Sequence, residues 1–283
     1  MSQRQKPTLT YRFTNSVLPH LVLFTYTLIA IFPILLIVLN SFKERKAIFG
    51  EPLIPPTPET FSLIGYQTIV DRANFDRYFL NSIVVTVGSI LLILLIGAMA
   101  AFALSEYNFR GNTFLGLYLA VGIMIPIRLG TVGILTLVKA LGLVNNLIGL
   151  ILVYVAMGLP LTIFVLTQFM RQVPRELKEA ARVDGASEYR IFGLVLPLVR
   201  PAVATVAVFV MIPIWNDLWF PLILASGEST KTVTLGAQQF LGQFISDWNA
   251  VLASLTLAMV PILILYVIFS RQLIRGITAG SVK

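Results

Sequence analysis

The densest group of charged side chains in this chain lies between two long apolar runs, in the stretch RQVPRELKEAARVDGASEYRIFGLVLPLVRP from Arg171 to Pro201. At its centre, Ala180 and Ala181 stand among acidic and basic residues. Small side chains allow another backbone to approach closely, and charges around them give directional pairing, so this pattern is compatible with docking into a groove of a partner protein. The alternative is a solvated connecting loop, because charge runs are usually solvated.

A second polar group interrupts the apolar run PIWNDLWFPLI, where Asn216 and Asp217 stand between Trp215 and Trp219. An acidic residue inside an apolar span is costly and usually faces a protein interior or a water-filled cavity. One interpretation is that Trp215, Asn216 and Asp217 lie on the path of a polar solute, with the two polar side chains hydrogen-bonding the solute and an indole stacking on it. The other is a structural polar pair between helices, with the tryptophans at the membrane interface.

The sequence offers little for catalysis. It contains no cysteine and only one histidine, His20, which precedes an apolar run. No G-x-x-x-x-G-K-[ST] phosphate loop occurs, and no paired carboxylates or metal ligands come together in the pattern. We therefore predict no catalytic residues, no metal site and no bound cofactor, and a chain that is not an enzyme by itself.

The composition is that of a polytopic membrane protein. Hydrophobic residues make up 57% of the 283 residues and charged residues only 12%, against about 25% in soluble domains. We predict an all-α fold in contact with membrane lipid, with six spanning helices: residues 20–40, 79–104, 113–137, 147–170, 202–225 and 251–270. No small-residue cleavage pattern follows the first apolar run, so we expect it to be retained. The net charge of +8 reflects topology signals rather than nucleic-acid binding.

Basic residues predict the orientation. With the N-terminus inside, thirteen of the 21 Lys and Arg residues fall on the cytoplasmic side, and five of the other eight lie in the long outer loop 41–78, where the rule is weak. We therefore expect a cytoplasmic N-terminal segment (1–19), a spanning domain (20–270) with a cytoplasmic loop (171–201), and a cytoplasmic tail (271–283). Loop 41–78 is rich in proline and is expected to be irregular.

Local signals predict a helix–turn–helix elbow in loop 171–201. Pro174 suits a first helical turn, and RELKEAARV consists mostly of good helix formers. Asp184-Gly185 ends that helix, because glycine accepts the left-handed conformation that follows many helices. Ser187 can cap a second short helix, EYRIFG, and Pro197 and Pro201 are expected to end the segment.

The stretch EAARVDGASEYRIFGLVLPLVRP resembles the EAA loop of binding-protein-dependent ABC importer permeases, and more narrowly that of the maltose-type sugar-importer family, second permease subunit. Four further segments agree in order, from about residue 79 to the end: FLNSIVVT, LGLVNNLIGLIL, WNDLWFPLILA and GITAGSVK. The resemblance implies a protein of the bacterial inner membrane with three kinds of partner. These are a homologous permease with which it forms a heterodimer, a cytoplasmic ATPase dimer that binds ATP, and an extracytoplasmic solute-binding protein.

The resemblance also implies a mechanism. The elbow would sit in a cleft of the ATPase and carry its closing motion to the spans. For the individual residues, the resemblance implies that Glu179 is a rim contact, that Ala180 and Ala181 form a close-packing surface, and that Gly185 is the hinge of the elbow. Asp184 is included because it stands beside this turn. In that family the loop after the fifth span, which holds Glu228 and Lys231, touches the binding protein. The resemblance implies a sugar as the substrate, and Asn216 and Asp217 would then bind its hydroxyls; a polyol or glycerol phosphate is an alternative substrate. Two alternatives from other protein classes are an ion-coupled secondary transporter and a membrane scaffold without a transport role.

Overall fold

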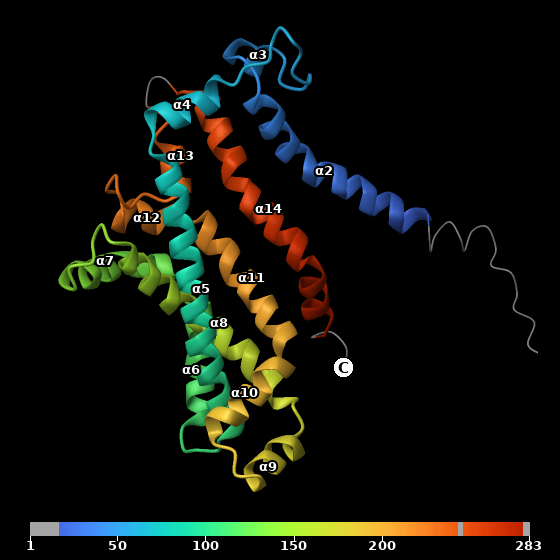
Figure 1. Cartoon of the computed structure of the whole chain (residues 1–283), viewed down its shortest axis with the longest axis vertical. Coiled ribbons are helices and arrows are strands. Elements are labelled where there is room, and N and C mark those ends of the chain that lie inside the picture. The colour runs from blue at the N-terminus through green and yellow to red at the C-terminus, as the bar shows by residue number, and fades with distance from the viewer. Residues whose placement is uncertain (1–16, 243–245, 280–283) are drawn as a thin grey trace, which may run out of the picture. The chain divides into compact units, whose positions relative to one another are not determined.

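Helices make up almost all of the regular structure in the described chain (Figure 1). The computed structural model describes residues 17–242 and 246–279, with side chains to residue 267. Its elements are α2 (Leu18–Ser41), α3 (Arg45–Gly50), α4 (Ile64–Arg72), α5 (Phe75–Glu106), α6 (Asn112–Met124), η2 (Ile127–Gly130), α7 (Thr131–Ala140), α8 (Leu147–Arg171), α9 (Arg175–Val183), α10 (Glu188–Leu198), α11 (Arg200–Asn216), α12 (Trp219–Leu224), α13 (Val233–Gln238) and α14 (Trp248–Ala279).

The prediction of an all-α polytopic protein is confirmed. Four helices of the described chain, α2, α5, α8 and α14, are long and apolar enough to cross a membrane, and they coincide with four of the six predicted spans. Two bent helix pairs bring the number to as many as six if each pair is one span. The predicted segment 1–19 lies largely outside the described residues, as do the last residues of the predicted tail, 280–283.

The third predicted span is broken. α6 ends at Met124, and the chain turns by 88° before η2 and α7 continue. The cause is local: Ile125 is extended, with φ −75° and ψ 122°, because the ring of Pro126 disfavours a helical conformation in the residue before it. Arg128 therefore lies in the short η2 helix after the bend, and not within a continuous helix as expected.

The fifth predicted span, 202–225, is also not one helix. α11 ends at Asn216, Asp217 is extended with φ −69° and ψ 133°, and α12 begins at Trp219. The start differs as well, because α10 continues through Pro197 to Leu198 and meets α11 at a bend of 76°. Pro197 therefore lies inside a helix instead of ending it, whereas Pro201 occupies the first turn of α11, where its missing N–H does no harm.

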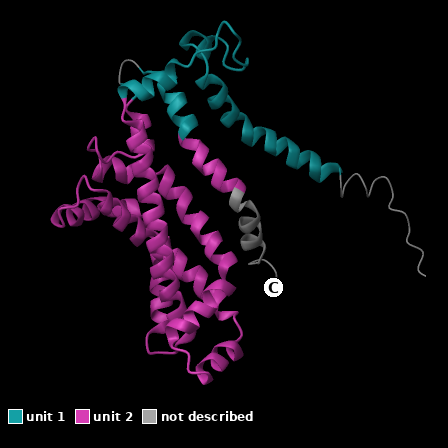
Figure 2. Cartoon of the chain, in the orientation of Figure 1, with its two compact units in different colours: residues 1–72, 240–257 teal, residues 73–239, 258–283 magenta. Residues whose placement is uncertain are grey.

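The chain forms two compact units, shown in teal and magenta in Figure 2. The first contains residues 1–72 and 240–257. In this unit the proline-rich loop 41–78, which was expected to be irregular, carries two short helices, α3 and α4. Its centre is the buried Lys43, whose ammonium donates to Asn40 Oδ1 (3.0 Å) and to the carbonyl of Glu51 (2.8 Å). Asn249, in the first turn of α14, donates in turn to the Lys43 carbonyl at 2.6 Å.

The second unit contains residues 73–239 and 258–283 and is built on the packing of α5 against α8. Glycine allows the two helices to approach closely: a Cβ on Gly97 would lie 2.6 Å from Thr162 Cγ2, and one on Gly158 would lie 2.6 Å from Ile93 Cδ1. Among the described spans, α5 is the long helix without an internal proline. It runs unbroken for 32 residues, which is about 48 Å.

Candidate functional site

The charged loop folds as the predicted elbow. α9 and α10 lie at the end of the second unit where α5 ends (Figure 1). Between them, Gly185 has φ +75°, a left-handed conformation that glycine adopts without strain. Its N–H donates to the Arg182 carbonyl (3.0 Å), and the N–H of Ala186 donates to the Ala181 carbonyl (2.9 Å). These two bonds form a Schellman motif, which satisfies the last carbonyls of α9 and fixes the turn.

A network of ion pairs joins the elbow to the end of α5. Glu106, the last residue of α5, accepts from Lys178 Nζ at 2.6 Å and from Arg182 Nη2 at 2.8 Å. Arg182 Nε also donates to Glu188 Oε1 at 2.9 Å, and the Tyr107 hydroxyl donates to Glu188 Oε2 at 2.8 Å. The side chains of Glu106 and Lys178 are only 9% and 7% exposed. Charged side chains therefore attach α9 directly to the end of α5, and α10 is attached through Arg182 and through Tyr107, the residue that follows α5.

The five residues predicted for coupling do not share one face. Glu179, Ala180, Asp184 and Gly185 are exposed, whereas Ala181 is 8% exposed and packs with the core of the second unit. The exposed side also carries large apolar side chains that the sequence argument did not select: Leu177, Val183 and Tyr189 are 56%, 87% and 80% exposed. Exposed apolar side chains beside a charged rim are typical of a protein interaction surface.

A cavity of about 430 Å³ lies between η2, α8 and α11, and its walls are mostly apolar. Arg128, Tyr154, Asn216 and Asp217 supply its polar lining. The guanidinium of Arg128 lies 5.7 Å from the centre of the Trp219 ring, a cation–π distance. The cavity therefore combines an apolar wall with an amide, a cation and a carboxylate, which is suited to a small solute with several polar groups.

The structure separates the three residues predicted for the solute path. Asn216 is exposed and lines the cavity. Asp217 lines it too, but its carboxylate accepts the N–H groups of Trp219 and Phe220 (both 3.1 Å) and the hydroxyl of Tyr154 (2.9 Å), so it also caps α12. Trp215 is 6% exposed and is not among the residues lining the cavity; its indole N–H donates to the Ala258 carbonyl at 3.0 Å.

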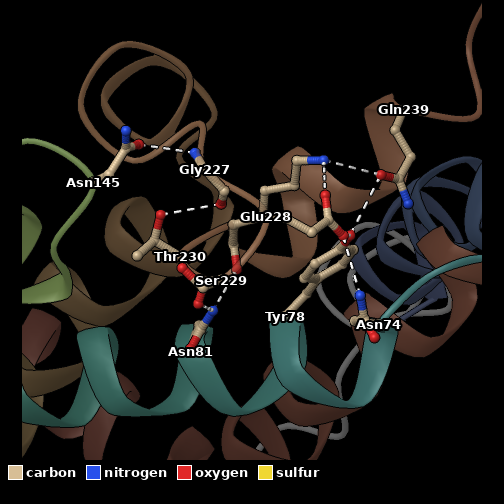
Figure 3. A network of polar contacts seen from close by, with 10 residues as sticks. Asn74, Tyr78, Asn81, Asn145, Gly227, Glu228, Ser229, Thr230 and Gln239 are labelled. Carbon is tan, nitrogen blue, oxygen red and sulfur yellow. Dashed lines mark hydrogen bonds and ion pairs between the residues drawn. The ribbon is translucent and has the colours of Figure 1, made fainter.

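At the opposite end of α5, a polar network holds the loop that follows α12 (Figure 3). Glu228 pairs with Lys231 at 2.6 Å and accepts hydrogen bonds from Tyr78 and Asn74. Asn81 donates to the carbonyls of Ser229 (3.0 Å) and Lys231 (2.9 Å). The ammonium of Lys231 and the hydroxyl of Tyr78 lower the pKa of Glu228 to about 2. The start of α5 is therefore bonded to this loop, and its end is bonded to the elbow.

Sequence reasoning missed Glu106 and Lys178 as functional candidates. Glu106 is two residues beyond the predicted end of a span, and 72 residues separate it from Lys178. No local spacing signals such a pair. One signal could have found the pair: Glu106 follows a span end that is predicted to be cytoplasmic, and the basic loop 171–201 is predicted to lie on the same side of the membrane.

Comparison with known proteins gives a consistent picture. The sequence pattern of the family described as "binding-protein-dependent transport system inner membrane component" matches residues 93–279. A putative ABC transporter permease of Caldicellulosiruptor is 38% identical, covering 91% of this chain and 94% of that protein. A diacetylchitobiose uptake system permease of Streptomyces coelicolor is 32% identical (93% and 88%), and an arabinooligosaccharides transport system permease of Halalkalibacterium halodurans is 32% identical (90% and 92%).

Among solved structures, the fold is similar to a chain in the crystal structure of a bacterial ABC transporter involved in the import of the acidic polysaccharide alginate. The TM-score is 0.77 at 21% sequence identity, covering 94% of this chain and 99% of that one. At this identity the likeness concerns the fold alone.

Proposed function

This chain belongs to the family of binding-protein-dependent transport system inner membrane components, and we propose that it is a permease subunit of an ATP-driven importer of a sugar or oligosaccharide. Relatives that match almost end to end are named as diacetylchitobiose and arabinooligosaccharide permeases, which supports a carbohydrate substrate. In this proposal the chain forms half of the pore beside a homologous permease. An extracytoplasmic binding protein delivers the solute, and a cytoplasmic ATPase dimer supplies the energy.

The observation that carries the proposal is the attachment of the elbow to α5. Glu106 binds Lys178 and Arg182 at once, so a displacement of α9 pulls directly on the end of α5. α5 contains no proline and packs along α8, and α8 lines the cavity. Closure of the ATPase around the elbow is therefore transmitted by α5 and α8 to the cavity, which alternates between an inward-facing and an outward-facing state.

The exposed elbow residues provide the docking surface in this scheme. Glu179 and Asp184 give charged rim contacts, and Ala180 leaves room for a close approach. Ala181 acts differently, because its side chain packs inside the subunit. Gly185 fixes the angle between α9 and α10 through its left-handed conformation. Both termini and the elbow are on the cytoplasmic side, and the Glu228 loop forms a rigid rim on the outer side that faces the binding protein.

On the solute path, Asn216 and Arg128 are the groups that can donate hydrogen bonds to solute oxygens from the cavity wall. The Trp219 ring lies against Arg128 and is 39% exposed. Asp217 orients α12 and shapes the cavity, and Trp215 supports the packing of α11 against α14. Arg128 also favours a second candidate substrate, a small solute with an anionic group such as glycerol phosphate.

The test uses the importer reconstituted in lipid vesicles with its partner subunits. ATPase activity is measured with and without solute-loaded binding protein, for the wild type and for Gly185→Asp, which adds a negative charge at the exposed turn. We expect the mutant complex to assemble and to lose its stimulation by the binding protein. Unchanged stimulation would mean that the elbow is a solvated loop. Uptake of labelled oligosaccharide against labelled glycerol phosphate then separates the two substrates.

A further inference from the structure

A groove of about 230 Å³ opens between α6 and α8 at the end of the second unit where α5 ends. It is separate from the solute cavity, and the two share no lining residue. Its apolar side is formed by Leu119, Ile163 and Phe164, and its polar side by Asn112, Gln168 and Arg171.

The polarity of the groove changes along the helix axes. Phe164, Gln168 and Arg171 follow one another at intervals of four and three residues, so they lie on one face of α8 and all three are exposed. Along this face the side chains pass from aromatic to amide to guanidinium toward the end of the helix. α6 begins at the same rim with Asn112, and its apolar lining residue Leu119 lies two turns further in.

One cation, Arg171, lies at the polar rim, at the last residue of α8. Arg171 donates to the Leu104 carbonyl at 3.4 Å through Nη2, which leaves other guanidinium N–H groups directed elsewhere. α6 starts after Gly111, which has no side chain to cap the helix. The N–H of Asn112 donates to the Phe109 carbonyl at 3.1 Å, and the N–H groups that follow it lie at this rim with the positive end of the helix dipole. The described residues that line the groove include one cation, Arg171, and no carboxylate.

We propose that this groove binds one anionic phospholipid, with the headgroup phosphate at Arg171 and an acyl chain along Phe164. A basic pocket between spanning helices that is polar at the membrane surface and apolar deeper in fits a lipid headgroup and its chain. The inference rests on the proposed orientation, which places this end of the helices in the cytoplasmic leaflet. A bound lipid would connect α6 to α8 beside the point where the elbow begins.

Native mass spectrometry of the purified full chain, with its partner subunits where they co-purify, tests this proposal. The probes are dioleoylphosphatidylglycerol and dioleoylphosphatidylcholine, added in equal amounts after delipidation. We expect one retained phosphatidylglycerol per chain, preferred about five-fold over phosphatidylcholine, since one basic contact near the membrane surface accounts for a preference of that order.

Two pairs of variants localise the site. Gly116, on α6, also lines the groove. Gly116→Leu fills the groove without strain, because a Cβ at Gly116 meets nothing within 4 Å. Its control is Gly133→Leu, on α7, where a Cβ also meets nothing. Arg171→Gln removes the charge and keeps an amide donor; its control is Arg200→Gln, an exposed cation at the start of α11. The preference should disappear in Gly116→Leu and Arg171→Gln and persist in both controls.

Three results would overturn the inference: equal retention of the two lipids by the wild type, an unchanged preference in Arg171→Gln, or displacement of phosphatidylglycerol by excess inorganic phosphate, which would identify a site for free anions. Lipid retention does not depend on ATP hydrolysis or on solute. A failure of the lipid site is therefore distinguishable from a failure of the proposed transport function, which the ATPase assay reports.

Discussion

The carboxylate of Glu106 and the ammonium of Lys178 lie 2.6 Å apart, although 72 residues separate them in the sequence and both side chains are almost fully buried. This pair connects the last residue of α5 to the middle of α9. It attaches the elbow to the long helix through a buried contact, and the loss of Glu106 would leave the Lys178 charge buried without that partner.

Lys178→Met should therefore destabilise the chain. The loss of one partner from a buried ion pair costs about 3–5 kcal/mol, here reduced because Arg182 still pairs with Glu106. A thermal unfolding scan of the purified importer should show a clear decrease in Tm. The matched control is Lys46→Met, an exposed lysine in α3. Equal Tm values for the two variants would contradict the structural importance of the pair.

The double variant Glu106→Gln/Lys178→Gln separates charge from contact. It keeps two groups that can hydrogen-bond and leaves neither charge of the pair buried alone, so it should recover much of the stability lost in Lys178→Met. Coupling should not recover, because Arg182 loses its charged partner on α5. Recovery of both Tm and binding-protein-stimulated ATPase activity would show that the ion pair is not needed for transmission.

At the elbow, the backbone conformation of Gly185 should matter more than its lack of bulk. Space is open around it, but φ is +75°, so Gly185→Ala adds about 1 kcal/mol of backbone strain without a clash. Gly185→Asn should be milder, since asparagine tolerates the left-handed region better than alanine. We expect stimulated ATPase activity to decrease in the order Gly, Asn, Ala. Equal activities for all three would refute a conformational role.

Asp217 and Asn216 are neighbours in the sequence, but we predict that substitution of Asp217 affects stability whereas substitution of Asn216 affects solute uptake. Asp217→Ala removes an acceptor for two N–H groups at the start of α12 and for the Tyr154 hydroxyl, which should cost about 1–2 kcal/mol and lower Tm. Asn216→Ala should leave Tm unchanged and raise the solute concentration needed for half-maximal uptake. A large decrease in Tm for Asn216→Ala with normal uptake would place its role in the fold rather than in the solute path.

The Glu228 loop should lose stability in acid. The pKa of Glu228 is lowered to about 2 in the folded chain, against an ordinary value of 4.5. A lowered folded-state pKa stabilises the fold above pH 4.5, and this contribution decreases as the pH falls from 4.5 toward 2. Hydrogen exchange of residues 226–232 at pH 6 and pH 3 should show acid-induced opening in the wild type. Glu228→Gln should show a smaller difference between the two pH values; an equal difference would contradict this assignment.

Much of the fold could be predicted from apolar segments of about twenty residues, because four of them form single helices. Three of these lie within about four residues of the expected bounds, whereas α14 continues to Ala279, past the expected end at residue 270. The two breaks could not be located in advance. A proline predicts that a helix can end, but Pro126 accompanies a break whereas Pro160 lies within α8, and only the packing around each decides. The elbow was predictable since its start, its turn and its glycine are local signals. Its attachment to Glu106 was not, since contacts between distant segments leave no local pattern.

In the proposed importer, α5 transmits motion from the elbow through Glu106. The most direct measurement is the number of solute molecules transported per ATP hydrolysed by the reconstituted importer, for the wild type, Glu106→Gln and the exposed control Glu59→Gln. We expect Glu106→Gln to assemble and hydrolyse ATP but to transport several-fold less solute per ATP, whereas Glu59→Gln should match the wild type. An unchanged ratio in assembled Glu106→Gln would contradict it.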